Sequence, residues 1–396
     1  MDIRKDIEEN FEYFKKLRRY LHTIPEIGYQ EFETSKKVEE ELKKLEIPYE
    51  GGYATTGIIA TIKCGDKDRS IAFRADMDAL EIVEKNDFEH KSCNHGMMHA
   101  CGHDGHTAIL LAFAKLLTKY KHFFNGTVYL IFQPAEEGLG GAKVMIEDGL
   151  LDKYKIDKIF SIHNRPTEDF GKIFVKMGTM MASYDNYKIT IHGKSTHSSM
   201  PQTGKNPIVV AAHIVTAIKS ITSLDISPIK KSVVTVASIN GGGALNIIPD
   251  SCEIGGSIRA YEDDVRVDIE RRIKEIAEHI SLAFGMECDI DYNKGYPSTI
   301  NTDIDSATKG AIDTVGAQNL MDQFEPSFGA EDFSYFLEKI PGCYAWLGSR
   351  IDENTSNLHN SRFDFNDDLI KIGAEFFFNM TKYELNDEYC CSDFTI

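Results

Sequence analysis

The 396-residue chain lacks the features of membrane, secreted and nucleic-acid-binding proteins. Basic residues are too few to balance the acidic ones, 44 against 62, and the net charge is −18. Such a surface should repel phosphate backbones and anionic lipid. We find no apolar run long enough to cross a bilayer, and the charged N-terminus, MDIRKDIEENFEYF, has no apolar signal-peptide core. We therefore expect a cytoplasmic protein with no nucleic-acid or membrane partner.

Closely spaced cysteine pairs of the CxxC type are also missing. The eight cysteines are scattered, and most should be free thiols in a reducing compartment. Cys390 and Cys391 lie in a polar C-terminal tail, where fraying is the simplest expectation. Cys101 has a histidine two residues away on either side, His99 and His103.

Internal repeats and low-complexity linkers are absent, and the length favours two domains. A helix is expected at 3–24 and a second at 33–47, with Thr34 or Ser35 near its cap. Short apolar strands then alternate with helices. This order predicts an α/β fold in which a large mixed sheet has helices on both faces.

Residues 183–293 follow a different order, strand–helix–strand–strand–helix–strand, which is typical of a ferredoxin-like α+β unit. Helix and strand material resumes after it. We therefore predict a larger domain in two parts, 1–182 and 294–396, with a smaller domain at 183–293 inserted into it.

The stretch MHACGHDGHTA, residues 98–108, holds three histidines, one cysteine and one aspartate just before a predicted helix. Cys101 and His103 can converge if they lie on a turn, and a helix N-terminus stabilises a thiolate. Taken alone, a Cys–x–His pair is more often structural than ligating. His99 and His106 can be ordinary packing or surface residues.

Other polar side chains follow predicted strands, at the sheet edge where open α/β folds bind ligands. FRADMD places Asp76 and Asp78 at one strand end, and FSIHN places His163 at another. In FQPAEEGLGGA, Glu136 and Glu137 follow a third strand. Neighbouring side chains there point in different directions, so one carboxylate can bind a metal while the other faces a reacting water.

His359, in the polar loop NLHNSRFDFNDD, adds one more candidate. Each candidate alone has a simpler explanation, such as a solvated acidic turn. Together the thiol, imidazole and carboxylate groups form a set suited to Zn²⁺, Mn²⁺ or a similar divalent ion.

Eight segments resemble, in the same order, the metal-dependent amidohydrolases of the aminoacylase and carboxypeptidase family. The branch they resemble contains hippurate hydrolases, indole-acetyl-amino-acid hydrolases and N-acetyl-diaminopimelate deacetylases. The segments are RRYLHTIPEIGYQEFET, FRADMDAL, MHACGHDGHTA, FQPAEEGLGGA, SIHN, ALNIIPD, FGAEDFSYF and LHNSRFDFNDD.

This resemblance implies a hydrolase that cleaves the amide bond of N-acyl amino acids and holds two divalent ions per subunit, Zn, Mn, Co or Ni. Cys101 matches the position that bridges the metals, and Glu136 matches the general base. Asp76 matches an acidic active-site residue, with Asp78 as its near alternative. The other implied ligands are His103, Glu137, His163 and His359.

The inserted domain resembles the family's lid, which also forms a homodimer interface. His197 matches a lid histidine that reaches the partner's active site, and Asn246 and Arg259 match positions associated with the substrate's carboxylate end. Departures from the family pattern occur at Ser195, Thr196, Ser198, Gln202 and Glu81. They leave the substrate preference open.

Three alternatives remain. A deacetylase of lysine biosynthesis acting on N-acetyl-diaminopimelate would share every motif. A non-catalytic metal or metabolite binder has no need of a second carboxylate, Glu136, beside a ligand carboxylate. A thiol-redox role for Cys101 is weakened because no second cysteine lies close by in the sequence.

Overall fold

The computed structural model describes residues 2–390, which form two compact units. The first unit comprises the chain up to Gly178, Ile300–Glu325 and the chain from Asp332 onward. The second comprises Thr179–Thr299 and Pro326–Glu331. Cys391 and the side chain of Cys390 lie outside the described residues, so the expectation for the C-terminal tail stays a prediction.

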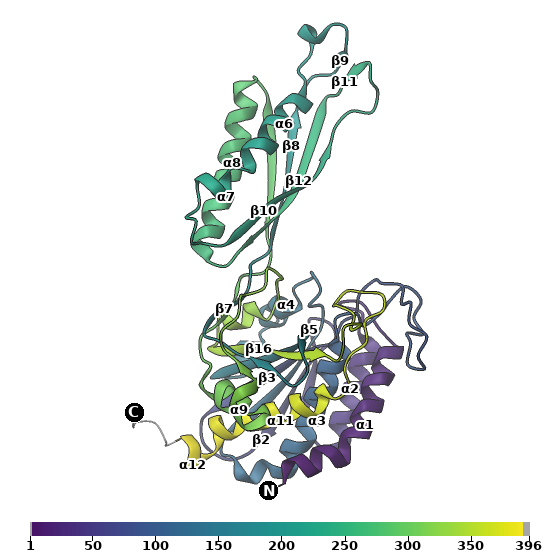
Figure 1. Cartoon of the computed structure of the whole chain (residues 1–396), viewed down its shortest axis with the longest axis vertical. Helices are drawn as coiled ribbons and strands as arrows, with labels where there is room; N and C mark the ends of the chain where they lie inside the picture. Colours follow the sequence, from purple (N-terminus) through teal and green to yellow (C-terminus); the bar gives the residue numbers. More distant parts are fainter. Residues whose placement is uncertain (1, 391–396) are drawn as a thin grey trace. The chain divides into compact units, whose positions relative to one another are not determined.

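The first unit is built on an eight-stranded mixed sheet in the order β1-β2-β4-β3-β5-β16-β6-β15 (Figure 1). Its central strands β4, β3, β5 and β16 run parallel, and β2 and β6 flank them in antiparallel pairs. Every residue of β3 is buried, as expected for a strand covered on both faces. The strands are β1 (Tyr49–Tyr53), β2 (Gly57–Lys63), β3 (Ser70–Asp76), β4 (Thr127–Gln133), β5 (Lys158–Asp169), β6 (Ile173–Phe174), β15 (Leu320–Met321) and β16 (Gly342–Arg350).

Helices cover both faces of this sheet, which confirms the predicted fold class. Phe73 of β3 packs against Phe113 and Phe377 of two helices on one face, and Arg74 lies over the Phe333 ring on the other. The first face carries α1 (Ile3–Thr23), α2 (Phe32–Lys44), α3 (His103–Tyr120), α9 (Asp305–Val315) and α11 (Leu369–Leu385). The remaining helices of the unit are α4 (Gly141–Glu147), α5 (Leu150–Lys153), α10 (Ser334–Leu337) and α12 (Asp387–Cys390).

The N-terminus of α2 is capped differently from the prediction. The carboxylate of Glu26, in the connection between α1 and α2, accepts the backbone N–H groups of Glu33 at 3.1 Å and Thr34 at 2.9 Å. The expected cap by Thr34 or Ser35 is therefore wrong, because a side chain from outside the helix satisfies these free N–H groups.

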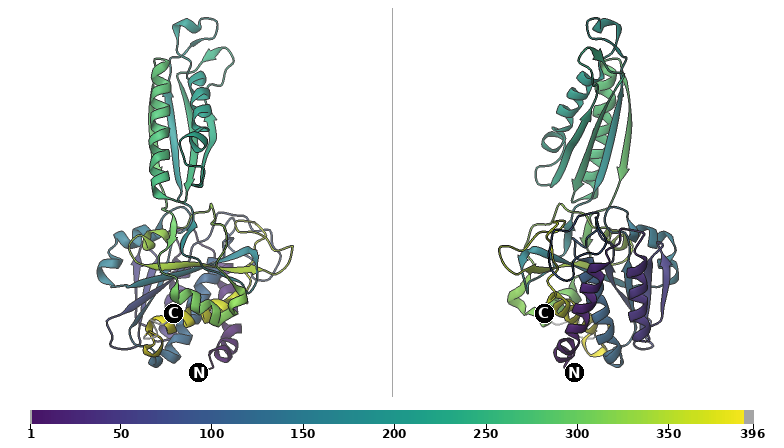
Figure 2. Two further views of the ribbon diagram at one scale, coloured as in Figure 1. Left: turned by 60° about the vertical axis from the view of Figure 1, so that its left-hand side comes forward. Right: turned by 90° about the vertical axis from the view of Figure 1, so that its right-hand side faces the viewer.

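The second unit is a four-stranded antiparallel sheet in the order β10-β12-β8-β13. Helices α6 and α8 lie together on one face of the sheet, as Figure 2 shows. Its larger elements are β8 (Asp185–His192), α6 (Pro207–Ile218), β10 (Ser232–Asn240), β12 (Ser251–Ala260), α8 (Asp263–Ala283) and β13 (Glu287–Lys294). Shorter elements are β9 (Thr196–His197), α7 (Ile221–Leu224) and β11 (Ile247–Ile248). The paired strands β7 (Gly178–Met181) and β14 (Thr299–Asn301) each include residues of both units. The predicted order of a ferredoxin-like unit is confirmed.

One segment of the second unit, Pro207–Leu224, is long and apolar enough to cross a membrane by length and composition, with a mean hydropathy of 1.6. The expectation that no apolar run reaches this length is therefore wrong: the segment contains a single charged residue, Lys219. In the structure, Val210, Ile214 and Ile218 on one side of the segment pack into the core of the unit. The core helix of a globular domain can have the same length and apolar composition as a membrane-spanning helix.

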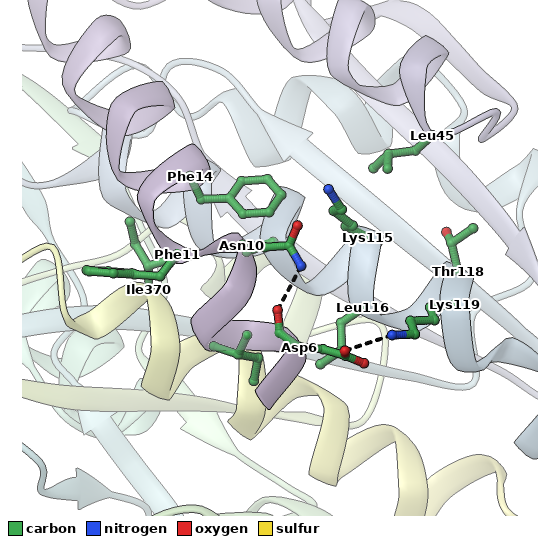
Figure 3. Close-up of a pocket in the computed structure, with 12 residues that line it drawn as sticks. Asp6, Asn10, Phe11, Phe14, Leu45, Lys115, Leu116, Thr118, Lys119 and Ile370 are labelled. Atoms are coloured by element: carbon green, nitrogen blue, oxygen red, sulfur yellow. Dashed lines mark hydrogen bonds and ion pairs between the residues drawn. The ribbon is translucent and has the colours of Figure 1, made fainter. Parts of the chain in front are cut away.

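A cavity of about 260 Å³ lies between α1 and α3 in the first unit (Figure 3). Phe11, Phe14 and Leu116 give it apolar walls, and Asp6 pairs with Lys119 at 2.7 Å at its edge. None of the described candidate site residues lines it. The candidate site is therefore a separate part of the same unit.

Candidate metal centre

Five candidate ligands from four segments of the first unit come together at the carboxyl end of the sheet. Cys101 and His103 stand at the start of α3, Glu137 follows β4, His163 lies on β5, and His359 is in the loop after β16. The Cys101 Sγ atom is 3.3 Å from His163 Nε2. His359 Nε2 is 3.2 Å from Glu137 Oε1. Residues widely separated in sequence thus meet at the edge where parallel strands present their ligand-binding loops.

The donor atoms fall into overlapping groups, two of which contain Cys101. Within each group they lie within 4.8 Å of one another: Cys101 with His103 and His163, and Cys101 with Glu137 and His359. Cys101 belongs to both. A thiol, three imidazoles and a carboxylate are groups that bind Zn²⁺ and related ions. These side chains would be able to hold divalent cations, with Cys101 available to both groups.

Gly102 resolves the ambiguity of the Cys–x–His spacing. Its φ of +95° is in the left-handed region, and a Cβ there would lie 2.4 Å from Asn164 Oδ1. Only glycine fits such a backbone without strain. The turn places Cys101 before α3, and His103 begins the helix. Because Cys101 lies on a turn and not on the helix, the two side chains can point toward the same place.

His359 is held in place by the same segment. Its backbone N–H donates to the carbonyl of Ala100 at 2.8 Å, and its φ is +61°. The loop after β16 is therefore attached directly to the residue before Cys101.

Asp78 supports two of the candidate ligands. Its carboxylate lies 3.1 Å from His103 Nδ1 and accepts the backbone N–H of Glu137 at 2.9 Å. The other ring nitrogen, His103 Nε2, is buried without a hydrogen-bond partner. A carboxylate that fixes one nitrogen of a histidine and leaves the other free is the usual support of a metal-binding imidazole.

Asp76 makes different contacts. It accepts hydrogen bonds from His106 Nδ1 at 2.6 Å and from Arg74 at 2.7 Å, and it lies 3.8 Å from His103 Nε2. Burial alone would raise the pKa of Asp76, but His103, His106 and Arg74 hold it well below its usual range. Of the two aspartates singled out in the sequence, Asp78 is the one that contacts two candidate ligands.

Burial and the neighbouring carboxylates shift the pKa values of three candidate ligands. Burial, followed by Glu137 and Glu136, raises the pKa of the Cys101 thiol well above its ordinary value. Burial lowers the pKa of His163 well below its usual range. Burial disfavours the charged form of His103, yet Asp76 and Asp78 raise its pKa to about 10. A bound cation would neutralise the carboxylates and favour the thiolate.

Two residues of the site were not recognised in the sequence. His106 is buried between Asp76 and Asn164, whose Oδ1 lies 2.7 Å from His106 Nε2. The spacing of His106 from His103, three residues on a predicted helix, puts both on one face. That spacing could have indicated that His106 belongs to the site. For Asn164, the only indication in the sequence is its position after His163.

The remaining predicted residues belong to the second unit. His197 on β9 is exposed, and its Nδ1 lies 2.8 Å from Ser199 Oγ. The carbonyl of Asn246 accepts the N–H of Ser198 at 2.9 Å, so Asn246 lies beside His197. Arg259 lies on a different strand, β12, where its guanidinium stacks over the Tyr184 ring at 4.2 Å.

A buried charge cluster lies behind the N-terminus of α3. His22 Nδ1 is 2.7 Å from an oxygen of Asp104, the residue after His103, and Arg18 lies 3.6 Å from the same carboxylate. Burial would lower the pKa of His22, but Asp104 outweighs burial and raises it to about 9. Burial would raise the pKa of Asp104, but His22 lowers it.

This pair predicts a pH dependence of stability. The pKa of His22 is higher in the folded chain than in the unfolded chain, where it is near 6.5. Protonated His22 therefore stabilises the fold fully at pH values below about 6.5, and this contribution is lost as pH rises through about 9. Its size is at most on the order of 3 kcal/mol. Urea unfolding of the metal-stripped protein should show stability falling between these pH values, and His22→Gln should flatten the slope. Equal slopes in both proteins would contradict the assignment.

The fold and the candidate ligands together define an α/β protein with a cation-binding group of side chains at the carboxyl end of its sheet. Residues 72–383 match the protein family described as Peptidase family M20/M25/M40. The chain belongs to this family and is a hydrolase.

Individual relatives cover nearly the whole chain. A hippurate hydrolase of Campylobacter jejuni is 40% identical over 366 residues, 92% of this chain and 94% of that protein. An N-acetyl-L-cysteine deacetylase of Bacillus subtilis is 36% identical over 381 residues, 95% of this chain and 90% of that protein. The crystal structure of the Bacillus subtilis YXEP protein, a dinuclear metal-binding peptidase from the M20 family, matches with a TM-score of 0.82 and 32% identity. That match covers 94% of this chain and 98% of the other.

Proposed function

We propose that the protein is a metal-dependent hydrolase that cleaves the amide bond of N-acyl amino acids to a carboxylate and a free amino acid. The observation that carries this proposal is the pair of adjacent carboxylates after β4. Glu137 belongs to a ligand group with Cys101 and His359, and both glutamates form a further group with His103. The names of the relatives, which include a hippurate hydrolase and an N-acetyl-L-cysteine deacetylase, support the substrate class.

We propose that two divalent ions, Zn, Mn, Co or Ni, bind here. The residues present fit them, because the buried His103 Nε2 has no hydrogen-bond partner and the neutral His163 offers a lone pair. When bound, such ions polarise a carbonyl and lower the pKa of water from about 16 toward 7. The proposed ligands are Cys101, His103, Glu137, His163 and His359.

Glu136 is proposed as the general base. Its carboxylate takes a proton from water while the water oxygen attacks the amide carbon. It then passes that proton to the nitrogen as the carbon–nitrogen bond breaks, which makes the amine a better leaving group. Asp76 is proposed as an acidic active-site residue. Its carboxylate accepts hydrogen bonds from His106 and Arg74 and so supports the site.

The segment 183–293 is proposed as a lid that binds the substrate's carboxylate end through Asn246 and Arg259 and forms a homodimer. Exposed apolar side chains near the two-stranded sheet of β9 and β11 support an interface: Leu245 is fully exposed and Ile247 is half exposed. His197 is proposed to reach the partner's site.

A mixed dimer tests this assembly. If His197 acts across the interface, His197→Ala and Glu136→Gln homodimers should both be inactive. A dimer with one change on each chain should then regain about half of the wild-type activity, because one site keeps both residues. A mixed dimer as inactive as the homodimers would contradict action across the interface, and a monomer in light scattering would contradict the dimer itself.

We propose that the protein works in the cytoplasm. The six cysteines whose side chains the structure describes are free thiols, as is usual in a reducing compartment.

A substrate panel tests the activity. Amine release is measured from N-acetyl and N-benzoyl amino acids, from N-acetyl-diaminopimelate and from a blocked dipeptide, before and after chelation. We expect hydrolysis of several N-acyl amino acids. Activity on N-acetyl-diaminopimelate alone would identify the biosynthetic deacetylase, and metal binding without any hydrolysis would favour a non-catalytic binder.

A further inference from the structure

The connection between α1 and α2 packs against the loop that carries the adjacent glutamates. We infer that Glu31, in this connection, is a positioning residue that orients Glu136 through the backbone of Ala135. The inference rests on the role proposed above for Glu136.

Both oxygens of the Glu31 carboxylate are engaged. Oε1 accepts the backbone N–H of Ala135 at 2.8 Å, and Oε2 accepts the hydroxyl of Thr56 at 2.6 Å. Glu31 is fully buried. Burying a carboxylate is costly unless it is hydrogen-bonded. The two hydrogen bonds offset this cost and hold Glu31, Thr56 and the Ala135 backbone in a fixed geometry.

Ala135 needs such support. It is fully buried and has a φ of +57°, a left-handed conformation that is unfavourable for a residue other than glycine. Its carbonyl accepts the N–H of Gly141 at 2.9 Å. Strained backbone of this kind persists only where its surroundings hold it. Because Ala135 directly precedes Glu136, its conformation sets the direction of both glutamates.

Two neighbours of Glu31 contact the same loop. A Cβ on Gly28 would lie 3.0 Å from Ala135 Cα, and the Tyr29 hydroxyl donates to the carbonyl of Leu139 at 3.0 Å. The connection therefore meets the loop at three points. Glu26, in the same connection, bonds to α2 instead and provides a matched control.

Removal of Glu31 would leave the Ala135 N–H buried without a partner and allow the turn to relax. Glu31→Ala should lower kcat roughly 10–100-fold, the usual effect of losing an outer support of an active site. KM and metal content should stay close to wild type. Glu31→Gln should keep most of kcat, because its amide oxygen can accept the Ala135 N–H while the Thr56 hydroxyl accepts its N–H.

A second substitution distinguishes positioning from a general loss of stability. Glycine adopts the left-handed conformation without steric cost, so Ala135→Gly in the Glu31→Ala background should recover part of the lost kcat. Glu26→Ala should lower the melting temperature without a comparable fall in kcat. If Glu31→Ala does not fold, Thr56→Val replaces it, since it removes one of the two bonds to the carboxylate and should reduce kcat severalfold.

Wild-type kcat in Glu31→Ala or Thr56→Val, or no recovery by glycine, would overturn the inference. So would equal losses of kcat in Glu31→Ala and Glu26→Ala. Glu136→Gln is measured in parallel: full activity there would remove the proposed role of Glu136, whereas an inactive Glu136→Gln beside a normal Glu31→Ala would overturn the positioning role alone.

Discussion

Glu136→Gln is expected to fold and bind metal like the wild type but to lose turnover by roughly 10²–10⁴-fold. The amide of glutamine has nearly the same shape as the carboxylate, but it cannot take a proton from water or deliver one to the leaving nitrogen. Steady-state kcat on the best substrate of the panel, with metal content measured on the same sample, checks this result.

The adjacent residue provides the control. Glu137 Oε1 lies 3.2 Å from His359 Nε2 and belongs to a ligand group with Cys101. Glu137→Gln should therefore lower the metal content, whereas Glu136→Gln should not. Near-normal turnover in Glu136→Gln, or metal loss equal to that of Glu137→Gln, would reverse the roles assigned to the two carboxylates.

Removal of metal is expected to have the second large effect. Exhaustive chelation should reduce amide hydrolysis to below about one hundredth of its starting value, since neither the carbonyl nor the water would then be activated. Adding back Mn²⁺, Zn²⁺ or Co²⁺ should restore it. Cys101→Ser should bind less than two ions per chain, because Cys101 belongs to both ligand groups.

Cys64 allows a matched cysteine control. It is a half-buried free thiol in the same unit, and its sulfur contacts the carbonyl of Ile62 rather than any candidate ligand. Cys64→Ser should keep both ions and full activity. Undiminished hydrolysis by protein shown to be free of metal would contradict a metal-dependent mechanism.

The strand-end argument succeeded where parallel strands decide the geometry. The strands that end before Glu136 and contain His163 were recognisable as apolar runs, and β4, β3 and β5 are parallel neighbours. Parallel strands present their carboxyl ends at one edge, so these side chains had to lie near one another. The inserted unit was equally predictable, because its order of helices and strands is that of a known motif.

The contacts that complete the site depend on the tertiary structure. His359 is placed by a bond from its backbone to Ala100 and by a positive φ, neither of which a polar loop sequence indicates. The bond from Ala135 to Glu31 joins residues 104 positions apart. Nothing in the local pattern of FQPAEEGLGGA predicts a left-handed alanine, because propensity favours glycine there. The α2 cap failed for the same reason, since Glu26 lies outside the helix.

Anomalous X-ray diffraction from crystals of the Mn²⁺-loaded protein would test the metal centre directly. We expect two peaks about 3.5–4 Å apart, with the Cys101 sulfur between them, and with Glu137 coordinated and the Glu136 carboxylate bound to neither ion. A single peak, a pair of peaks away from Cys101, or an ion coordinated by Glu136 in place of Glu137 would contradict the account.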